Sequence, residues 1–543
     1  MYYLGINPGR HDSAAALVKD GTIIAMAEQE RFSRRKRAVG EAPIDAVEFC
    51  LSYAGITLAD VDAIGLGWNF GRMREHGQNI DLDTTERLFP ANRFPGPLPP
   101  VQSIDHHVAH AASCFGPSGF PEAAVLVVDG GGELESTTLG YYDGSQFHTL
   151  EQIQLPFSLG NYYAAATKYT GMKARDAGKF MGLAAYGRPD QHMPLQVGRH
   201  GLYLDRLPEF SPSGRFDDLD AFRATVLQHF TESSFPFAVG DGRDMYPFIG
   251  FAASVQHSLE QALLYLAERV KRLTGSRNLC LAGGVALNCS ANGILARSGL
   301  FGNLFVQPAA HDSGVALGAA LEIARCNGAN LMQTGPMTQG YWGPSYSQEV
   351  IEDALCRHGI AYERLSEAQL IERTAHAIME DKIVGWFQGR GEFGPRALGA
   401  RSLLGNPRKR HMLTRLNALK GREAWRPLAP SVTAEAFNDF FESPHASPFM
   451  IVAAHVHPGR RHEIPAVVHV DGSARPQAVT RAANPRYWTL LTRLGDLTGI
   501  PVVINTSFNL DDEPIVNTPD EAINDFLRTD MEMLVIGDAI AVK

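Results

Sequence analysis

The sequence predicts a mixed α/β protein with a duplicated, phosphate-binding core followed by a second unit. Within residues 1–330, three apolar strands each run through a glycine-bearing turn toward a helix, and the 53 glycines of the chain favour such turns. After Arg325 the composition shifts to Gly, Pro, Asn and Thr, which is typical of a linker. A chain of 543 residues exceeds what one hydrophobic core usually serves. We therefore expect two domains, residues 1–345 and residues 346–543.

The first elements are a strand and a hairpin. Residues 2–7 are apolar and bounded by Pro8-Gly9, so they predict a strand. Residues 13–33 contain two apolar segments that meet at Asp20-Gly21, a preferred two-residue hairpin turn. Residues 123–133 predict a buried strand that enters a glycine-rich turn.

The later elements follow from the same signals. Residues 278–296 predict a strand, the turn Gly283-Gly284, and a helix that starts near Asn288. The second unit begins with the glycine-rich residues 383–404. The remaining expected elements are a helix in residues 251–273, a turn and helix in residues 309–324, and strands in residues 501–510 and 532–542.

The bulk composition excludes several classes of partner. A net charge of −10 without an overall basic bias argues against nucleic acid. No stretch approaches the roughly 18 apolar residues of a membrane span, and the N-terminus has neither the basic leader nor the apolar run of a signal peptide. The six cysteines are scattered without a C-x-x-C pair, which favours reduced thiols. We expect a cytoplasmic protein with small-molecule partners.

The segment "SIDHHVAHAASCF" contains a candidate metal site. His106 and His110 are four residues apart, so on a helix both imidazoles lie on one face. Asp129 follows the buried strand "VLVV", and Asp312 lies in the turn "HDSG". Two imidazoles and two carboxylates suit Fe(II), Mn(II) or Zn(II) better than Mg(II). The alternative is that the histidines are hydrogen-bonded helix residues and the aspartates are helix caps.

Three further segments of the first domain carry candidate groups. In "INPGRHDSAA", Gly9 permits close approach of an anion, and His11 is a candidate general base; the alternative is a solvated turn histidine. In "DAGKFMGLAAYG", the ammonium of Lys179 lies between glycine-bearing turns and either meets a phosphate or is solvated. The basic run "RFSRRKR", residues 31–37, either is a solvated face or rims an anionic pocket.

The second domain concentrates cations beside turn glycines. Arginine grips phosphate or carboxylate in a planar, bidentate manner, and this many cations in an acidic protein exceed what a solvated face needs. The pattern favours a pocket for ATP or an acyl phosphate. The residues concerned are Arg390, Arg396, Arg401, Lys420, Arg422, Arg426, His469 and Arg475, with Asn505, Ser507 and Asn509 after a buried strand.

Taken together and in order, eight motifs resemble the O-carbamoyltransferases of the NodU/CmcH type, which include nodulation-factor and antibiotic-tailoring enzymes. The motifs are "HHVAHAASCF", "VVDGGGE", "GKFMGLAAYG", "GGVALNCSANG", "GEFGPRALGARSLL", "KGREAWRPLAP", "HVDGSARPQAV" and "INTSFN". The resemblance implies an N-terminal duplicated ATPase fold of the actin/hexokinase/Hsp70 type. It also implies a C-terminal α/β domain similar to threonylcarbamoyl-adenylate synthase.

The chemistry that this resemblance implies has two steps. The C-terminal domain makes carbamoyl-adenylate from carbamoyl phosphate and ATP, with Mg bound to the ATP, and releases phosphate and pyrophosphate. The N-terminal domain transfers the carbamoyl group to a hydroxyl of a small natural product, with a glycosylated antibiotic as the expected acceptor. The implied cofactor of this domain is Fe(II) or another divalent first-row metal. A homodimer is left open.

The resemblance also assigns roles to individual residues. It implies that His11 deprotonates the acceptor and that Arg396 and Lys420 act in adenylate formation. The implied metal ligands are His106, His110, Asp129 and Asp312. The implied nucleotide-binding residues of the N-terminal domain are Lys179, Gly283, Gly284 and Asn288. The implied ATP and carbamoyl phosphate pocket of the C-terminal domain comprises Arg396, Lys420, Arg426, Arg475, Asn505 and Ser507.

One position departs from the family pattern, and other functions stay open. Where the family is expected to have glycine after "NTSFN", this chain has Asp512, so the turn either tolerates aspartate or changes shape. A sugar kinase of the actin-like fold is one alternative, although it needs only one nucleotide cleft. Threonylcarbamoyl-type modification of tRNA is another, disfavoured by the net negative charge. A non-enzymatic iron sensor is the remotest.

Overall fold

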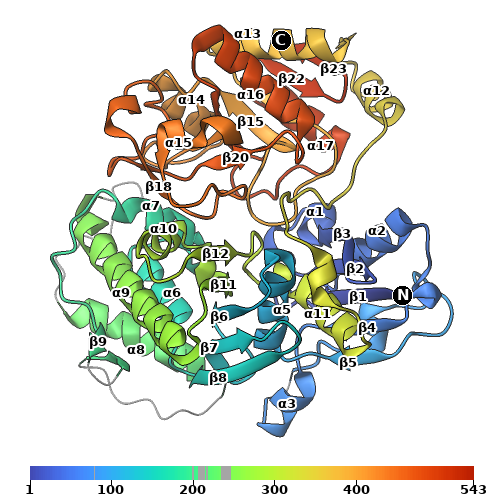
Figure 1. Ribbon diagram of the computed structural model, residues 1–543. Helices are drawn as coiled ribbons and strands as arrows, with labels where there is room; N and C mark the ends of the chain where they lie inside the picture. Colours follow the sequence, from blue (N-terminus) through green and yellow to red (C-terminus); the bar gives the residue numbers. More distant parts are fainter. Residues whose placement is uncertain (79, 199–200, 206–214, 216–217, 234–245) are drawn as a thin grey trace. The chain divides into compact units, whose positions relative to one another are not determined.

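The computed structural model describes residues 1–78, 80–198, 201–205, 215, 218–233 and 246–543, and this part of the chain divides into two units (Figure 1). Unit 1 comprises Met1–Gln29 and Ala38–Met337. Unit 2 comprises Glu30–Arg37 and Thr338–Lys543. The expected boundary at residue 345 lies a few residues past the change of unit at Thr338, and residues 30–37, which we expected in the first domain, group with unit 2. Arg31 and Arg34 of this segment bond to distant residues of unit 2, which no local sequence pattern reveals.

The first sheet of unit 1 has five strands in the order β3-β2-β1-β4-β5. The strands β1, β2 and β3 form an antiparallel meander, whereas β4 and β5 add in parallel to β1. The predicted hairpin turn is confirmed, because Asp20 and Gly21 both have positive φ angles, 48° and 83°. The bounds are β1 Tyr2–Asn7, β2 Ala14–Lys19, β3 Thr22–Glu28, β4 Ala63–Leu66 and β5 Val101–Ser103.

The second sheet of unit 1 repeats this topology. Its order is β12-β11-β6-β7-β8, again with an antiparallel meander of three strands and two strands added in parallel. The predicted duplicated α/β core of the actin type is therefore confirmed. The bounds are β6 Ala123–Val128, β7 Glu135–Tyr142, β8 Phe147–Gln154, β11 Asn278–Ala282 and β12 Asn303–Val306. A separate hairpin pairs β9 Leu195–Gly198 with β10 Gly201–Leu204.

Two central helices join the sheets of unit 1 (Figure 1). Helix α11, Ser313–Cys326, packs on β1 and β2, while α5, His106–Ser118, packs on β6 and β11, and the two helices contact each other. Glycines permit this approach, since a Cβ atom on Gly318 would lie 1.7 Å from the carbonyl oxygen of Ala109. The other helices of unit 1 are α2 Ile44–Ala54, α3 Phe70–Glu75, α4 Thr85–Leu88, α6 Leu159–Tyr169, α7 Ala177–Ala184, α8 Asp218–Glu232, α9 Ile249–Thr274 and α10 Cys289–Arg297.

Unit 2 is built on an eight-stranded mixed sheet, as the expected α/β class requires. The order is β13-β23-β22-β14-β15-β21-β16-β20. The side chains of two consecutive residues pack into different hydrophobic cores. Trp386 packs with α13 (Glu367–Met379) and α16 (Pro485–Thr498), and Phe387 packs with α12 (Gln348–Arg357), α14 (His411–Leu419) and α17 (Pro519–Arg528). Both faces of the sheet are therefore covered by helices.

The bounds of these strands are β13 Glu363–Arg364, β14 Val384–Phe387, β15 Arg401–Gly405, β16 Ala429–Thr433, β20 Gln477–Val479, β21 Val502–Ser507, β22 Met533–Ile536 and β23 Ala539–Val542. A small second sheet contains β17 Phe441–Glu442, β18 Ala454–Val456 and β19 Ser473–Ala474. The helices are α1 Glu30–Ser33, α12 Gln348–Arg357, α13 Glu367–Met379, α14 His411–Leu419, α15 Phe437–Phe440, α16 Pro485–Thr498 and α17 Pro519–Arg528.

The structure also describes the longest helices and the cysteines, which the composition brought into question. Among the described residues, no helix is both long enough and apolar enough to cross a membrane. All six cysteines are free, and four of them are buried, whereas Cys326 and Cys356 are exposed at or near the ends of their helices.

Candidate functional site

Four buried side chains of unit 1 converge where α5, β6 and α11 meet. His106 and His110 lie one turn apart on α5, Asp129 follows β6, and Asp312 is the N-terminal cap residue of α11. One ligand atom from each side chain lies within 4.8 Å of the others. Nε2 of His106 is 3.6 Å from Oδ2 of Asp129 and 3.8 Å from Oδ1 of Asp312. These separations exceed hydrogen-bond lengths and suit atoms that share one ion.

The ring nitrogens favour a metal site over a purely structural role. Nδ1 of His106 lies 3.0 Å from the carbonyl oxygen of Gly67, so we assign the proton to Nδ1, and Nε2 presents its lone pair to the cluster. In the described part of the chain, Nε2 of His106 and both ring nitrogens of His110 are buried without a hydrogen-bond partner. The Asp312 carboxylate makes no capping hydrogen bond. Because buried unpaired polar atoms are unfavourable, the donor set fits a first-row divalent ion.

The third histidine of the segment has a different role. Nδ1 of His107 lies 2.8 Å from Oγ1 of Thr138, which joins α5 to β7. Burial lowers the pKa of His107 to about 3, and the neighbouring His106 adds to this effect. The ring is therefore neutral at physiological pH and belongs to the packing around the cluster.

Two residues beside His106 were not found by sequence analysis. The indole of Trp68 stacks on the His106 ring with centroids 3.8 Å apart, and its Nε1 donates to Oδ1 of Asn7. The Glu133 carboxylate accepts the backbone N–H of His106 at 3.0 Å. Burial raises the pKa of Glu133 to about 7. No local signal identifies these residues, because their contacts join segments that are distant in the sequence.

The structure places His11 beside the histidine–aspartate cluster. Nδ2 of Asn7 donates to the carbonyls of His11 and Asp12, which fixes the loop after β1. Nδ1 of His11 lies 2.9 Å from Oδ2 of Asp12 and 3.5 Å from Oδ2 of Asp312. Its side chain is 41% exposed, so a ligand can reach the ring from solvent. This geometry suits a group that exchanges protons at the edge of the cluster.

The glycine turn after β11 adjoins the same cluster. A Cβ atom on Gly283 would lie 2.3 Å from the carbonyl oxygen of Val128, and the residue has a φ of 90°. The N–H of Gly284 donates to Oδ1 of Asp129 at 2.7 Å. Asn288 caps α10 by accepting the N–H of Ala291, and its amide also pairs with Gln256. Asn288 is thus occupied as a structural residue.

Lys179 lies on α7, which meets the start of α10. Sγ of Cys289 approaches Sδ of Met181 at 3.9 Å, so the two helices are neighbours. Nζ of Lys179 lies 3.8 Å from Oδ1 of Asp176 in the preceding turn. The ammonium therefore has a carboxylate near it within its own segment.

Unit 2 contains a cluster of cationic side chains that repel one another. We call Lys420, Arg422, Arg426 and Arg475 the cationic cluster. Burial lowers the pKa of Arg422 to about 9, helped by the charges of Arg426 and Arg475. Burial also lowers the pKa of Lys420 well below its usual value, with Arg422 and Arg426 contributing. Such a cluster is stabilised when an anion binds.

Lys420 organises the turn that follows β21. Its ammonium donates to the main-chain carbonyl of Ser507, and to the carbonyl and Oδ1 of Asn509 at 2.6 and 3.1 Å. Nδ2 of Asn509 closes the turn by donating to the carbonyls of Leu510 and Glu513, both at 2.8 Å. The side chain of Lys420 is fully buried, so its first role is to hold this turn.

Asp512 occupies the turn at the position where glycine was expected. Its φ is 62°, in the left-handed region. Glycine adopts this region without strain, and aspartate is among the residues that tolerate it. The structure therefore answers the question that the sequence left open: the aspartate adopts the backbone conformation for which glycine is suited.

Asn505 and Ser507 are two positions apart on β21, so their side chains leave the same face of the sheet. Nδ2 of Asn505 donates to Oγ of Ser431 at 3.0 Å, and Lys420 approaches Oγ of Ser507 at 3.4 Å. Oδ1 of Asn505 is buried and has no hydrogen-bond partner among the described residues. This face therefore offers one unused acceptor beside the cationic cluster.

Two of the arginines in residues 390–401 bond to main-chain carbonyls, and the third is partly exposed. Arg401 is buried, lies 3.7 Å above the Phe387 ring, and donates to main-chain carbonyls that include those of Gln388 and Pro344. Arg390 donates to the carbonyl of Gly343. Both therefore stabilise the fold. Arg396 is partly exposed in the loop between β14 and β15.

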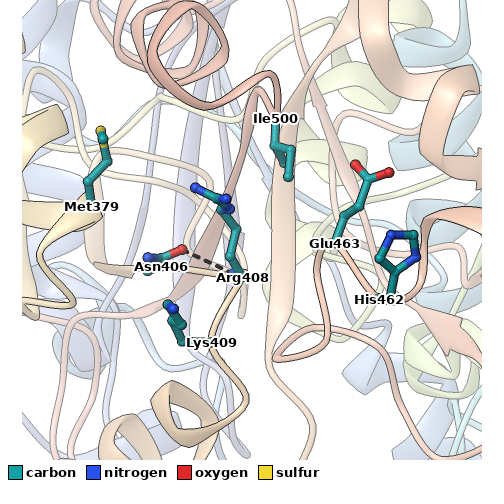
Figure 2. A pocket seen from close by; sticks show the side chains of 7 residues that line it. All are labelled: Met379, Asn406, Arg408, Lys409, His462, Glu463 and Ile500. Atoms are coloured by element: carbon teal, nitrogen blue, oxygen red, sulfur yellow. Dashed lines mark hydrogen bonds between the residues drawn. The ribbon is translucent and has the colours of Figure 1, made fainter.

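A surface cavity of about 490 Å³ is distinct from this site (Figure 2). It is lined by Met379, Asn406, Arg408, Lys409, His462, Glu463 and Ile500. Asn406 follows the end of β15 and Ile500 precedes β21, whereas Ser507 pairs with Ser402 near the start of β15. The cavity and the Lys420–Ser507 contact therefore lie at opposite ends of the β15–β21 pair.

The fold and the two clusters define a class of protein that combines an actin-like core with a second unit bearing a cluster of cationic side chains. Residues 2–71 and 95–321 match the family model described as carbamoyltransferase N-terminus, and residues 375–543 match carbamoyltransferase C-terminus. The chain therefore belongs to the carbamoyltransferase family.

Two nodulation proteins agree with this membership. Nodulation protein NolNO of Sinorhizobium fredii is 37% identical, over 99% of this chain and 80% of the relative. Nodulation protein U of Rhizobium tropici is 31% identical, over 92% of this chain and 89% of the relative. Among solved structures, full-length HypF in its phosphate- and nucleotide-bound form matches at 12% identity with a TM-score of 0.36, over 61% of this chain and 56% of that chain.

Proposed function

We propose that this carbamoyltransferase is ATP-dependent and works in two steps, one in each unit. Unit 2 charges the carbamoyl group as carbamoyl-adenylate, and unit 1 transfers it to a hydroxyl. The proposed acceptor is a small natural product, with a glycosylated antibiotic as the expected class. The main support is that the cationic cluster belongs to unit 2, whereas the histidine–aspartate cluster belongs to unit 1.

The first step is proposed for the cationic cluster of unit 2. Carbamoyl phosphate, ATP and one water give carbamoyl-adenylate, phosphate and pyrophosphate. Water first attacks the phosphorus of carbamoyl phosphate, the bond from that phosphorus to the carbamoyl oxygen breaks, and carbamate and phosphate result. A carbamate oxygen then forms the new bond to the α-phosphorus of ATP, and the bond from that phosphorus to the oxygen that bridges it to the β-phosphorus breaks, which releases pyrophosphate. Arg396, Arg426 and Arg475 neutralise the phosphate charges as pyrophosphate leaves. The unused acceptor of Asn505 is suited to an N–H of the carbamoyl group.

The role of Lys420 in this step follows from its contacts. Because its ammonium is bonded to Ser507 and Asn509, it sets the shape of the turn that faces the substrates. Its positive charge also adds to the field that attracts the phosphates. We therefore assign Lys420 to the pocket chiefly as the residue that holds Ser507 in position.

The second step is proposed for unit 1. His106, His110, Asp129 and Asp312 would hold Fe(II) or another divalent first-row ion, which when bound supplies Lewis-acid polarisation. Gly283 and Gly284 leave room for the nucleotide, and the ammonium of Lys179 is proposed to meet its phosphate. His11 takes the proton from the acceptor hydroxyl as its oxygen attacks the carbamoyl carbon. AMP is the leaving group, so atoms and charge balance.

Two other functions are less well supported. A sugar kinase needs one nucleotide cleft, so it leaves the cationic cluster of unit 2 without a purpose. Modification of tRNA requires a surface that attracts a polyanion, and the chain has a net charge of −10. Carbamoyl transfer to a small molecule uses both sites.

The test of the first step omits the acceptor. Purified protein is mixed with ATP, Mg and labelled carbamoyl phosphate, and pyrophosphate release is measured. The proposal predicts slow release that depends on carbamoyl phosphate, because the adenylate forms but is not consumed. Release at the same rate without carbamoyl phosphate would favour an ordinary nucleotide hydrolase.

A further inference from the structure

The two residues that follow strand β4 both contact the imidazole of His106. The carbonyl oxygen of Gly67 lies 3.0 Å from Nδ1 of His106, and the indole of Trp68 stacks on the imidazole with centroids 3.8 Å and planes 29° apart. An imidazole N–H lies in the plane of its ring, whereas a stacking contact acts on the face of the ring. Together the two contacts fix both the direction and the tilt of the ring whose Nε2 faces the cluster.

The same indole holds the loop that carries His11. Nε1 of Trp68 donates to Oδ1 of Asn7 at 3.2 Å. Nδ2 of Asn7 in turn donates to the carbonyl oxygens of His11 and Asp12 at 3.0 and 2.9 Å. The guanidinium of Arg10, in the same loop, lies 5.9 Å from the centre of the indole, within the range of a cation–π contact. One side chain therefore contacts both a ring of the cluster and the loop after β1.

The indole N–H determines which way the Asn7 amide points. Asn7 is fully buried, and its side chain has one oxygen acceptor and two N–H donors. Because Trp68 donates to the oxygen, the NH₂ group faces the two main-chain carbonyls of the loop. Asp12 has a φ of 55°, and its carbonyl also accepts Oγ of Ser313 at 3.2 Å. Since a left-handed aspartate persists only where neighbouring contacts hold it, the loop depends on this amide.

The position of the loop sets the distance from His11 to the cluster. Nδ1 of His11 lies 3.5 Å from Oδ2 of Asp312. A displacement of a reacting group by about 1 Å can cost about 100-fold in rate. A side chain that contacts both His106 and the loop of His11 therefore controls the geometry between a proposed metal ligand and the proposed base.

Packing of the hydrophobic core is the simplest alternative role for Trp68. The residue is 2% exposed and forms a small apolar cluster with Phe70 and Met73. Core packing explains why a large apolar side chain stands here. It does not explain why the indole N–H is directed at the amide that holds the His11 loop, nor why the ring stacks on an imidazole that Gly67 already binds.

We propose that Trp68 is a positioning residue for carbamoyl transfer, which orients the imidazole of His106 toward the metal and, through Asn7, holds the loop of His11 beside the cluster. This inference rests on the proposed function of unit 1. The stacking contact and the N–H donor belong to different parts of one side chain, so two substitutions can remove them separately.

The first variant removes only the donor, and Co(II) is the metal used as the probe. Trp68→Phe keeps an aromatic face against His106 but leaves Oδ1 of Asn7 buried without this hydrogen bond. We expect the Co(II) affinity, measured by equilibrium dialysis, to stay near the wild-type value. Amide hydrogen exchange of residues 9–13, measured by mass spectrometry, should become roughly 5-fold faster or more, the scale of one buried acceptor that loses its donor.

The second variant, Trp68→Leu, removes the stacking contact as well. Its Co(II) affinity should fall roughly 10-fold or more, the scale for residues behind metal ligands, and the visible absorption of bound Co(II) should change because it reports ligand geometry. Phe70→Leu is the matched control, since Phe70 is fully buried in the same apolar cluster and its ring stacks on Trp68. The control should have a lower Tm but wild-type Co(II) absorption and wild-type exchange in residues 9–13.

The outcomes separate this inference from the proposed function. Unchanged exchange in Trp68→Phe overturns the link to the His11 loop, and unchanged Co(II) affinity and absorption in Trp68→Leu overturn the orientation of His106. If Phe70→Leu reproduces both effects, Trp68 acts only through core packing. If the wild type does not bind Co(II), the metal site of the proposed function is itself wrong, and the role of Trp68 falls with it.

Discussion

The strongest chemical signal at the scale of single residues is the set of unpaired ring nitrogens on α5. Nε2 of His106 and both nitrogens of His110 are buried without partners in the described part of the chain. The hydrogen bond from Nδ1 of His106 to Gly67 fixes which nitrogen faces the two aspartates. This arrangement is unfavourable for the protein alone and becomes favourable when a cation accepts the free nitrogens.

The first prediction concerns metal content. His110→Ala removes one of four ligands, so the affinity for Fe(II) or Zn(II) should fall at least about 10-fold, the scale seen even for residues behind the ligands. Elemental analysis after equilibrium dialysis provides the measurement. His148→Ala, at a half-exposed histidine that pairs with Asp143 on the edge of unit 1, should keep the full metal content. Equal metal content in both variants would argue against the site.

The residues of the histidine–aspartate cluster were predictable from the sequence, whereas those packed around it were not. The spacing of His106 and His110, the position of Asp129 after a strand and that of Asp312 in a turn before a helix identified all four members of the cluster, because these signals are local. Trp68 and Glu133 escaped, since only the tertiary fold brings them to His106. Lys420 was identified, but its bonds to the turn at Ser507 and Asn509 were not foreseen.

At the scale of elements, the contact between α5 and α11 sets the geometry of the metal cluster. Helix α5 carries both histidines, and Asp312 begins α11. Their close approach depends on Gly318, which lies against the backbone of Ala109. Because Gly318 has no side chain, the two helices approach closely enough to bring Asp312 to the two histidines.

The second prediction tests this dependence. Gly318→Ala places a Cβ atom 1.7 Å from the Ala109 carbonyl oxygen, so the helices must separate. We expect a loss of about 1–3 kcal/mol in the free energy of unfolding, together with weaker metal binding. Gly178→Ala on α7 is the control, because a Cβ atom there meets nothing within 4 Å. A fully stable Gly318→Ala variant with normal metal affinity would show that the helix contact is not limiting.

The third prediction concerns pH and the α13–α16 pair of unit 2. Arg493 donates to both oxygens of Glu372 at 2.7 and 2.9 Å, and this lowers the pKa of Glu372 to about 2. A carboxylate with a lowered pKa stabilises the folded state above its unfolded pKa of about 4.3, and this contribution disappears as the pH falls toward 2.

Glu372→Gln should therefore have a lower Tm than the wild type at pH 7, and the difference should shrink between pH 5 and pH 3. Thermal unfolding by circular dichroism at several pH values measures this. A difference in Tm that stays constant across that range would mean that the carboxylate charge is not responsible.

Most elements of the fold were predictable because their signals are local. The hairpin at Asp20-Gly21, the strand and glycine turn at residues 278–284, and the helix after Asp312 all occur where the sequence indicates them. The segment Glu30–Arg37 was not predictable, since its membership of unit 2 depends on carbonyls of Gly394 and Pro514 that are hundreds of positions away.

At the scale of the whole molecule, the proposed function divides carbamoyl transfer between two units with different electrostatics. Unit 1 presents imidazoles and carboxylates suited to a cation, and unit 2 presents clustered cations suited to phosphates. Because an adenylate hydrolyses in bulk water, the presence of both proposed sites in one polypeptide favours its transfer over its loss. The division predicts that each step can be disabled without the other.

The most direct measurement is the yield of labelled carbamoyl-adenylate formed by His110→Ala from ATP and carbamoyl phosphate, with Arg396→Ala analysed in parallel. We expect His110→Ala to form the adenylate at the rate of the wild type and to transfer nothing to an acceptor, while Arg396→Ala forms none. If His110→Ala fails to form the adenylate, or Arg396→Ala forms it normally, the assignment of charging to unit 2 and transfer to unit 1 is wrong.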